Sequence, residues 1–160
     1  MIRPARPADA DALAALQEHL DAPSPELLSS VAAVGTCLVS VSVAGVGDRD
    51  LPGGAPGAGE PVGYVLVVDG DDTYVAELVV HPAFRREGRG RALLRAALDR
   101  QDPGTRVTLA VAVDNEPARA LYESAGFRPI GRQSDFYERE TETADALVYA
   151  YDVPDEGAEG

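Results

Sequence analysis

The residues with the clearest chemical potential form an arginine- and glycine-rich stretch in the middle of the chain. In order, they are Arg85, Arg86, Glu87, Gly88, Arg89 and Gly90. An apolar strand pattern ends just before them at His81-Pro82, and an apolar helix pattern follows over residues 91–98. The first amides of a helix lack intrahelical acceptors and carry partial positive charge, and glycine lets a ligand approach the backbone closely. The stretch therefore predicts a binding site for a phosphorylated cofactor.

Positive charge concentrates on the same segment. The net charge of the chain is -13, and all 14 of its basic residues are arginine. Residues 85–100 hold six arginines against Glu87 and Asp99, a net charge of +4, so the remaining residues carry -17. A positive segment in an acidic chain favours an anionic ligand, whereas the overall charge argues against nucleic-acid binding. The acidic, lysine-free composition is typical of salt-adapted proteins, with an acidic GC-rich bacterial protein as the alternative.

Length and composition favour one domain over residues 1–153, followed by an acidic disordered tail over 154–160. We find neither a signal-peptide pattern nor an apolar run long enough to cross a membrane. Cys37 is the single cysteine and lies in an apolar run, so we expect it to be buried. These features predict a cytoplasmic protein without a membrane partner. Two separated histidines and one cysteine give no metal-ligand spacing, so we expect no metal.

Apolar periodicity and the positions of glycine and proline predict the surrounding elements. Strands are expected at residues 2–5, 36–43, 61–68, 75–80, 105–113, around 127–130 and at 145–151, and helices at 7–22, from Ser24 to Val31, at 91–98 and at 116–125, with a flexible loop over 45–61. Strands joined by short turns pair antiparallel, whereas strands joined by a crossover helix pair in parallel. The predicted fold class is therefore α/β (α+β), with a mixed, mostly antiparallel central sheet of about seven strands and helices on both faces.

Two common phosphate-binding motifs do not fit this chain. A Walker-A loop needs Gly-Lys-Ser/Thr, and the sequence contains no lysine. A dinucleotide site needs Gly-x-Gly-x-x-Gly in the first βα turn, whereas here the pattern is Arg-x-x-Gly-x-Gly and lies mid-chain after three antiparallel strands. The first class is excluded in its standard form, and the position argues against the second.

The arrangement instead resembles the GNAT superfamily of acetyl-CoA-dependent N-acetyltransferases. The central motif of that family, Arg/Gln-x-x-Gly-x-Gly/Ala, is met by residues 85–90, and residues 78–82 are similar to its strand-to-loop passage. A second family motif resembles residues 114–127, which read DNEPARALYESAGF. The resemblance extends to about Asp152 and implies the GNAT fold with acetyl-CoA as co-substrate.

The resemblance also implies how the cofactor is held. The amides of residues 86–91 would cradle the pyrophosphate, and the backbone of residues 78–80 would pair with the pantetheine arm where two parallel strands splay apart. The implied cofactor-binding residues are Leu78, Val79, Val80, Arg85, Arg86, Glu87, Gly88, Arg89, Gly90, Arg91 and Asn115. Asn115 is equally suited to be a helix N-cap. Arg91 and Arg95 are either contacts of the 3′-phosphate or exposed helix arginines.

Acetyl transfer to an amine needs a base for the ammonium, a donor for the oxyanion and a proton for the leaving thiolate. The resemblance places the proton donor on Tyr122, whose alternative role is packing, and the oxyanion donor on a backbone N–H near Val80. Glu77 is our candidate base because it lies on the central strand on the same face as Val79. Its alternative is a hydrogen-bonded structural glutamate. His81 is less favoured because it lies in the turn.

We therefore expect an N-acetyltransferase that acts on a primary amine of a small molecule or peptide by direct attack in a ternary complex. Residues 135–138 and 145–148 are similar to the branch that acetylates protein N-termini, including the ribosomal-protein type. That branch usually carries a glutamate where this chain has Ala110. The alternatives are this N-terminal acetyltransferase and a non-catalytic acyl-CoA-binding sensor. A homodimer formed through the last strands is compatible with each function.

Overall fold

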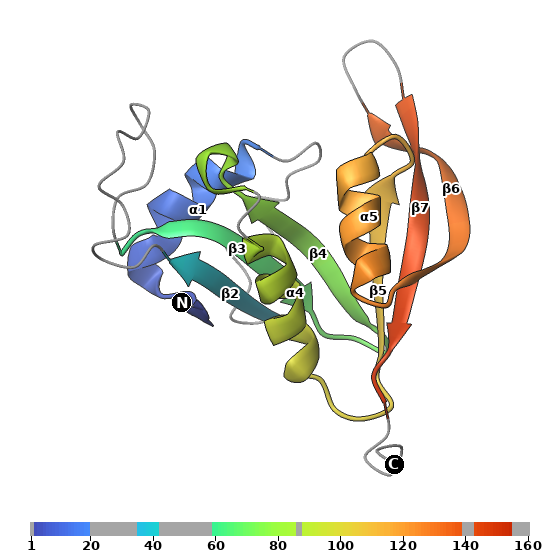
Figure 1. The fold of residues 1–160 in the computed structure, drawn as a ribbon, viewed down its shortest axis with the longest axis horizontal. Helices are drawn as coiled ribbons and strands as arrows, with labels where there is room; N and C mark the ends of the chain where they lie inside the picture. Colours follow the sequence, from blue (N-terminus) through green and yellow to red (C-terminus); the bar gives the residue numbers. More distant parts are fainter. Residues whose placement is uncertain (1, 20–34, 42–58, 86–87, 139–142, 155–160) are drawn as a thin grey trace.

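The computed structural model describes residues 2–19, 35–41, 59–85, 88–138 and 143–154 (Figure 1). The helix predicted from Ser24, most of the loop predicted over 45–61, Arg86 and Glu87, and residues 155–160 of the predicted tail lie outside these ranges. The strands are β1 (Ile2–Pro4), β2 (Gly35–Val41), β3 (Pro61–Val68), β4 (Thr73–Val80), β5 (Arg106–Ala112), β6 (Arg128–Glu138) and β7 (Thr143–Asp152). The helices are α1 (Ala10–Gln17), α4 (Arg89–Asp99) and α5 (Glu116–Ser124), with 3-10 turns η1 (Pro7–Asp9) and η2 (Pro82–Phe84).

The described strands form one seven-stranded sheet in the order β1-β2-β3-β4-β5-β7-β6. Every neighbouring pair is antiparallel except β4 and β5, which are parallel. This confirms the predicted mixed, mostly antiparallel sheet and the parallel pair around the crossover helix. The last strand, β7, lies between β5 and β6 and pairs with β5 along the whole of β5, from Arg106 opposite Asp152 to Ala112 opposite Ala146.

Strands β4 and β5 are paired at one end and apart at the other. Their register joins Thr73 to Val107 and Tyr74 to Thr108. Beyond these residues the two strands diverge, so that β1–β4 and β5–β7 form the two arms of a V (Figure 1). Helix α4 lies against the first arm and α5 against the second.

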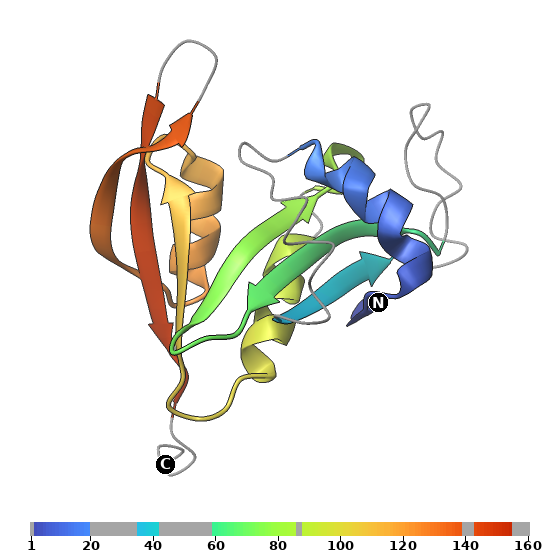
Figure 2. The same ribbon diagram turned by 180° about the vertical axis from the view of Figure 1, so that it is seen from behind.

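Helices cover both faces of the sheet, as predicted. Helices α4 and α5 lie on one face, and α1 lies on the other, where it faces the viewer in Figure 2. The core under α4 and α5 contains Leu38, Val65, Val75, Leu93, Leu94, Leu109 and Tyr149, among others. The core under α1 contains Leu13, Leu16, Cys37, Val39, Tyr64, Leu66 and Val79. Cys37 is buried, as expected from its apolar surroundings.

A β-bulge in β4 decides which side chains face α1. Leu66 of β3 pairs with Glu77, while the next residue, Val67, pairs with Val75, so Ala76 is the extra residue. Val75 belongs to the core on the α4 side, whereas Ala76 packs on the α1 side. The bulge therefore breaks the two-residue alternation of the strand and turns Glu77 to the α1 face.

Candidate active site

The site begins at the open end of β4, where the backbone of this strand has no neighbour on the β5 side in the register of the described residues. The amide of His81 donates to the carbonyl of Val62 at 2.7 Å. Because hydrogen-bonded pairs alternate along an antiparallel ladder, the backbone groups of Val79 face β3, and those of Leu78 and Val80 face the gap. Leu78, Val79 and Val80 were predicted to pair with the pantetheine arm. The backbone groups of Leu78 and Val80 face the gap and are available for such pairing, whereas those of Val79 face β3.

The N-terminus of α4 lies next to this edge. Gly88 caps the helix with a φ of 77°, the left-handed region that glycine adopts without strain. The amides of the first helical turn, from Arg89 onward, lack acceptors within the helix. A Cβ at Gly90 would lie 3.5 Å from Leu121 Cδ2 of α5 and 3.7 Å from Val80 Cγ2. Gly90 therefore marks the point where β4, α4 and α5 converge.

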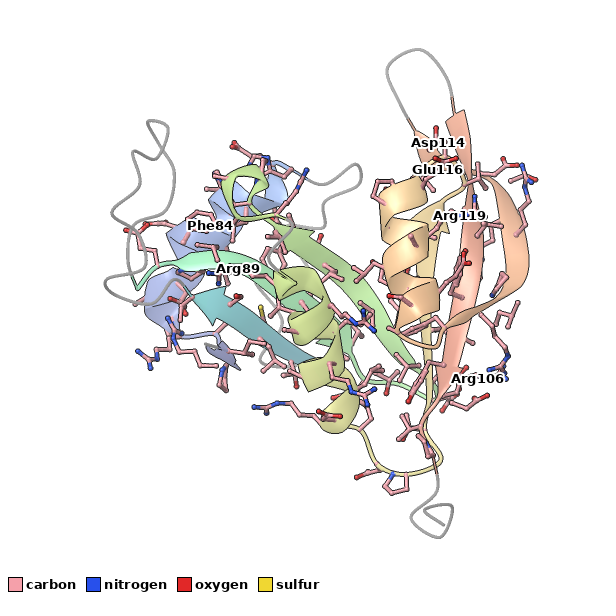
Figure 3. All side chains as sticks on the ribbon, viewed as in Figure 1. Phe84, Arg89, Arg106, Asp114, Glu116 and Arg119 are labelled. Carbon is pink, nitrogen blue, oxygen red and sulfur yellow. The ribbon has the colours of Figure 1, made fainter. Side chains whose placement is uncertain are left out.

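Two arginines of the central motif contact the protein itself. Arg85 Nε donates to the carbonyl of Val80 at 3.0 Å. Arg89 Nη1 donates to Ser40 Oγ at 2.9 Å, and its guanidinium lies 5.5 Å from the ring centre of Phe84. Figure 3 labels Arg89 and Phe84. These contacts tie Arg85 to β4 and Arg89 to β2. Binding of an anion by the backbone amides of this segment, which the family resemblance implied, stays a prediction.

Glu77 is buried on the α1 face of the opened strand, with 4% of its surface exposed. Its Oε1 accepts a hydrogen bond from the Tyr64 hydroxyl at 2.8 Å and another from Gln17 Nε2 at 3.0 Å. Such donors offset the cost of burying a carboxylate. The predicted position of Glu77, on the face of Val79 and opposite Leu78 and Val80, is confirmed by the two cores.

His81 is held in a structural contact. Its Nδ1 accepts a hydrogen bond from the amide of Ala83 at 3.0 Å and so caps η2. Its ring packs edge-on against that of His19, with 5.2 Å between the ring centres. Burial, then His19 and Arg85, lower the pKa of His81. Protonation at Nδ1 would break the cap, since a protonated nitrogen cannot accept. His81 is therefore a poor proton acceptor, in agreement with its low ranking among the sequence candidates.

Tyr122 lies on α5 in a cluster of aromatic rings. It is 8% exposed, and its ring centre is 6.0 Å from that of Phe127 and 6.4 Å from that of Tyr149. Packing is thus an observed role of Tyr122. Its role as proton donor to the thiolate stays a prediction.

Three polar residues around α5 hold this helix in place. Asn115 Oδ1 accepts the amide of Ala118 at 3.3 Å, so the predicted N-cap role of Asn115 is observed. Arg119 donates to the carbonyl of Val113 at 2.9 Å and to the Tyr149 hydroxyl at 3.3 Å; its place above β7 is visible in Figure 3. The Tyr149 hydroxyl in turn donates to a carboxylate oxygen of α5 at 2.7 Å. Tertiary contacts therefore define where α5 presents Tyr122.

Sequence reasoning missed Gln17, Tyr64, Arg119 and Tyr149 as parts of this site. One signal could have identified Gln17, which is a polar residue four positions after Leu13 on the apolar face of its helix. Tyr64 alternates with apolar residues of β3 and reads as ordinary core. The sequence contains no signal for its contact with Glu77.

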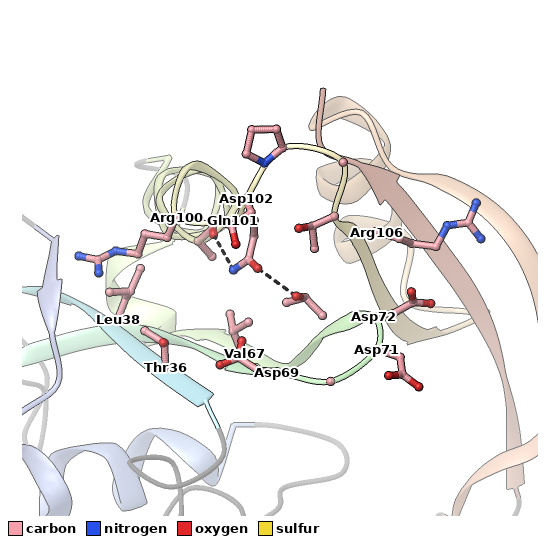
Figure 4. Close-up of a pocket in the computed structure, with 16 residues that line it drawn as sticks. Thr36, Leu38, Val67, Asp69, Asp71, Asp72, Arg100, Gln101, Asp102 and Arg106 are labelled. Atoms are coloured by element: carbon pink, nitrogen blue, oxygen red, sulfur yellow. Dashed lines mark hydrogen bonds between the residues drawn. The ribbon is translucent and has the colours of Figure 1, made fainter. Parts of the chain in front are cut away.

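Two hollows lie near opposite ends of β4. One of about 560 Å³ lies between α4 and the end of α5 and is lined by Gly88, Arg91, Arg95 and Ser124, among others. The other, of about 740 Å³, lies at the paired end of β4 and β5, and Asp69, Asp71, Asp72 and Asp102 line it (Figure 4). Thr73 at this second hollow is seven residues, roughly 23 Å along the strand, from Val80. Only the first hollow adjoins the open end.

Neither a metal site nor a membrane span is found in the described part of the chain. In these ranges no group of three or more His, Cys, Asp or Glu side chains could hold a metal ion. No described helix is long and apolar enough to cross a membrane.

The fold is that of acetyltransferases of known structure. The chain superimposes on the ribosomal-protein-S18-alanine N-acetyltransferase from Escherichia coli with a TM-score of 0.78 and 21% identity, over 100% of this chain and 97% of that one. It superimposes on Arabidopsis thaliana NAA60 in complex with acetyl-CoA with a TM-score of 0.74 and 22% identity, over 96% and 98% of the two chains. A sequence model of the acetyltransferase (GNAT) family matches residues 47–127, just over half of the chain. The protein therefore belongs to the GNAT family.

Curated relatives share parts of this sequence. The chain is 37% identical over 107 residues to N-alpha-acetyltransferase RimI of Mycobacterium tuberculosis, covering 64% of this chain and 66% of the relative. It is 31% identical over 80 residues to a putative ribosomal protein bS18-alanine N-acetyltransferase of Bacillus subtilis, covering 49% and 52%. It is 39% identical over 101 residues to mycothiol acetyltransferase of Mycobacterium sp. (strain JLS), covering 55% and 33%. The chain thus spans a third to two thirds of the length of these relatives.

Proposed function

We propose that this protein transfers the acetyl group of acetyl-CoA to a primary amine of a small molecule or peptide, by direct attack in a ternary complex. The observation that carries the proposal is the short pairing of β4 with β5, at Thr73 and Tyr74, followed by an open strand edge beside the N-terminus of α4. Membership in the GNAT family supports acetyl transfer as the reaction at this edge.

The residues around the opening suit acetyl-CoA. The outward amide and carbonyl of Leu78 can pair with the amide-containing pantetheine arm as a further strand would, which leaves the outward amide of Val80 for the reacting carbonyl. The first amides of α4 suit the pyrophosphate, because they combine unmet donors with the positive end of the helix dipole. The hollow beside Gly88, with Arg91 and Arg95 on its wall, suits the anionic nucleotide end. Asn115 uses Oδ1 for its cap, which leaves the Nδ2 amide as a donor toward pantetheine.

Three groups of this chain would carry the chemistry. Glu77 accepts the proton of the ammonium, directly or through water, so that the neutral nitrogen attacks the thioester carbon. The outward amide of Val80 stabilises the negative charge that develops on the carbonyl oxygen. As the new C–N bond forms and the C–S bond breaks, Tyr122 donates its hydroxyl proton to the departing thiolate and regains a proton from the nitrogen of the new amide, which gives it up.

The acceptor could also be a protein N-terminus. The names of the Bacillus and Mycobacterium tuberculosis relatives favour this second function. Ala110, where the N-terminal branch usually has a glutamate, lies on β5 and pairs with Val148 of β7. The absence of a carboxylate at this point counts against the N-terminal branch and makes Glu77 the candidate base, directly or through water.

Acetyl-CoA with a panel of small amines and of peptides with different N-terminal residues, monitored by release of free CoA, tests the proposal. We expect release to rise above the acceptor-free rate with at least one acceptor, and intact mass to show one added acetyl group on it. Binding of acetyl-CoA without release above hydrolysis would favour a non-catalytic sensor. Runs at several salt concentrations with light scattering also test the expected salt adaptation and homodimer.

A further inference from the structure

Three polar side chains are buried together in the otherwise apolar core under α1. They come from three elements: Gln17 ends α1, Tyr64 lies in β3 and Glu77 lies in β4. The exposed fractions are 5% for Gln17, 0% for Tyr64 and 4% for Glu77. Gln17 Nε2 also lies 3.4 Å from Glu77 Oε2, so its amide spans both carboxylate oxygens. Removing either donor would leave a buried carboxylate less well solvated.

A purely structural role does not require a carboxylate here. Well-packed apolar residues generally stabilise a core at least as well as a buried charged group and its partners do. Here a β-bulge at Ala76 turns Glu77 to this face. Two donors from separate elements then hydrogen-bond its carboxylate. Such an arrangement is expected where the protonation state and direction of the carboxylate matter.

We propose that Tyr64 and Gln17 are positioning residues that hold the Glu77 carboxylate in place and aimed for proton acceptance. The inference rests on the proposed acetyl transfer, in which Glu77 takes the ammonium proton. Both donors stabilise the charged form more than the neutral one, because charge-assisted hydrogen bonds are the stronger ones. Loss of either donor should then weaken proton acceptance by Glu77, which the acid limb of the rate profile reports.

The ionisable groups near Glu77 do not obscure the expected change in the pH dependence of kcat. Burial, then the hydrogen bond with Glu77, raises the pKa of Tyr64 far above neutrality. Burial, then Glu77 and Asp9, raises the pKa of Cys37 on β2 to about 12. Neither group titrates between pH 5 and 9. Other titratable groups on this side, among the described residues, are Asp9 of η1, which is paired with Arg3, His19 just after α1 and His81 after β4. They are present in wild type and variants alike.

The test compares pH profiles of kcat for wild type, Tyr64→Phe and Gln17→Leu with one fixed acceptor. Tyr74→Phe is the matched control, because it removes the same hydroxyl at the paired end of β4. We expect the acid limb of the profile to move up by about one pH unit in the first two variants, as loss of a hydrogen bond to a charged group implies, and to stay in place in the control. The KM for acetyl-CoA should change less than twofold, since cofactor contacts remain.

An acid limb that stays in place in both variants, with kcat or stability reduced at every pH, would overturn the inference and leave Tyr64 and Gln17 as packing residues. If wild type transfers no acetyl group to any acceptor, the proposed function fails instead. The positioning role is then read from isotope-edited infrared spectra of the Glu77 carboxylate, with Glu77→Gln to assign the band. The pH at which the ionised band disappears should be higher in Tyr64→Phe than in wild type, and equal values would refute it.

Discussion

The two ends of the β4–β5 pair differ in how their polar groups are satisfied. At the paired end, backbone groups meet in the ladder and the charges are exposed: Arg106 and Arg128 both contact Asp152. At the open end, strand and helix backbone groups face a gap, and a carboxylate is buried with its own donors. The same strands thus contribute stability at one end and candidate chemistry at the other.

The difference places the candidate site where the ladder between β4 and β5 stops. An unpaired strand edge offers donors and acceptors at fixed spacing, which an extended ligand can use in place of a strand. Exposed ion pairs such as those at Asp152 are screened by solvent and add little. Substitutions at the open end should therefore affect activity, and those at the paired end should affect stability or nothing.

Glu77→Gln should have the largest effect on activity. It removes the proposed proton acceptor but keeps the side-chain shape, so we expect kcat to fall by about 10²–10⁴-fold, the usual contribution of general-base catalysis. CoA release at saturating acetyl-CoA measures it. Asp72→Asn, the same change at the paired end, is the control and should retain wild-type kcat. Equal activity of Glu77→Gln and wild type would remove Glu77 from the mechanism.

Tyr122→Phe should have the next largest effect. The ring contacts with Phe127 and Tyr149 remain, whereas the hydroxyl is lost. A thiolate is a fair leaving group without help, so we expect kcat to fall by about 10–10²-fold, at the low end for general-acid catalysis. Thermal unfolding should change little. Unchanged turnover would leave Tyr122 with packing alone.

Substitutions at two glycines should distinguish an effect on acetyl-CoA binding from an effect on the stability of the fold. Gly90→Val places methyl groups between Val80 and Leu121, so acetyl-CoA affinity should fall about tenfold, a loss of about 1.4 kcal/mol, while the fold is kept. Gly35→Ala places a Cβ against the carbonyl oxygen of Val67 near the paired end, so stability should fall by about 1–3 kcal/mol. Calorimetric titration and denaturant unfolding measure the two. The opposite pattern would contradict the division between the two ends.

Asp152→Asn should have the smallest effect. Arg128, then Arg106, lower the pKa of Asp152 in the folded protein, so its ionised form favours folding above the unfolded pKa. That contribution is lost as the pH falls through the folded pKa. The small difference in Tm between variant and wild type should therefore be present at pH 7 and vanish in acid, with activity unchanged. A Tm difference that grows as the pH falls would show that the pKa of Asp152 is not lowered in the folded protein.

Local patterns predicted most of the elements correctly. The strand predicted at residues 61–68 coincides with β3, and the helix predicted at 91–98 lies within α4. Both rest on apolar periodicity that neighbouring elements reinforce. Helix α1 ends earlier than predicted, at Gln17, with Glu18 as its C-cap. Periodicity describes the apolar face of a helix but not the turn at which the chain leaves it.

The candidate site was predictable in part. Glycine placement and the strand-to-helix order identified the N-terminus of α4 and the edge at Leu78 and Val80, because these are properties of contiguous backbone. The partners of Glu77 were not predictable, because Gln17 and Tyr64 are 60 and 13 residues away along the chain. Contacts at such separations depend on how elements pack, which local propensity does not encode.

The sequence by itself determined the fold class and the order of strand, glycine-containing segment and helix over residues 75–98, whose anion binding stays a prediction. These follow from composition, periodicity and conformational preference over a few residues. Only the tertiary structure decided that β7 separates β5 from β6, that β4 and β5 part after Tyr74, and that Glu77 meets two donors. These features depend on which of several distant elements pack together at a sheet edge or in the core. Their stability is therefore a property of the whole folded chain and not of any one segment.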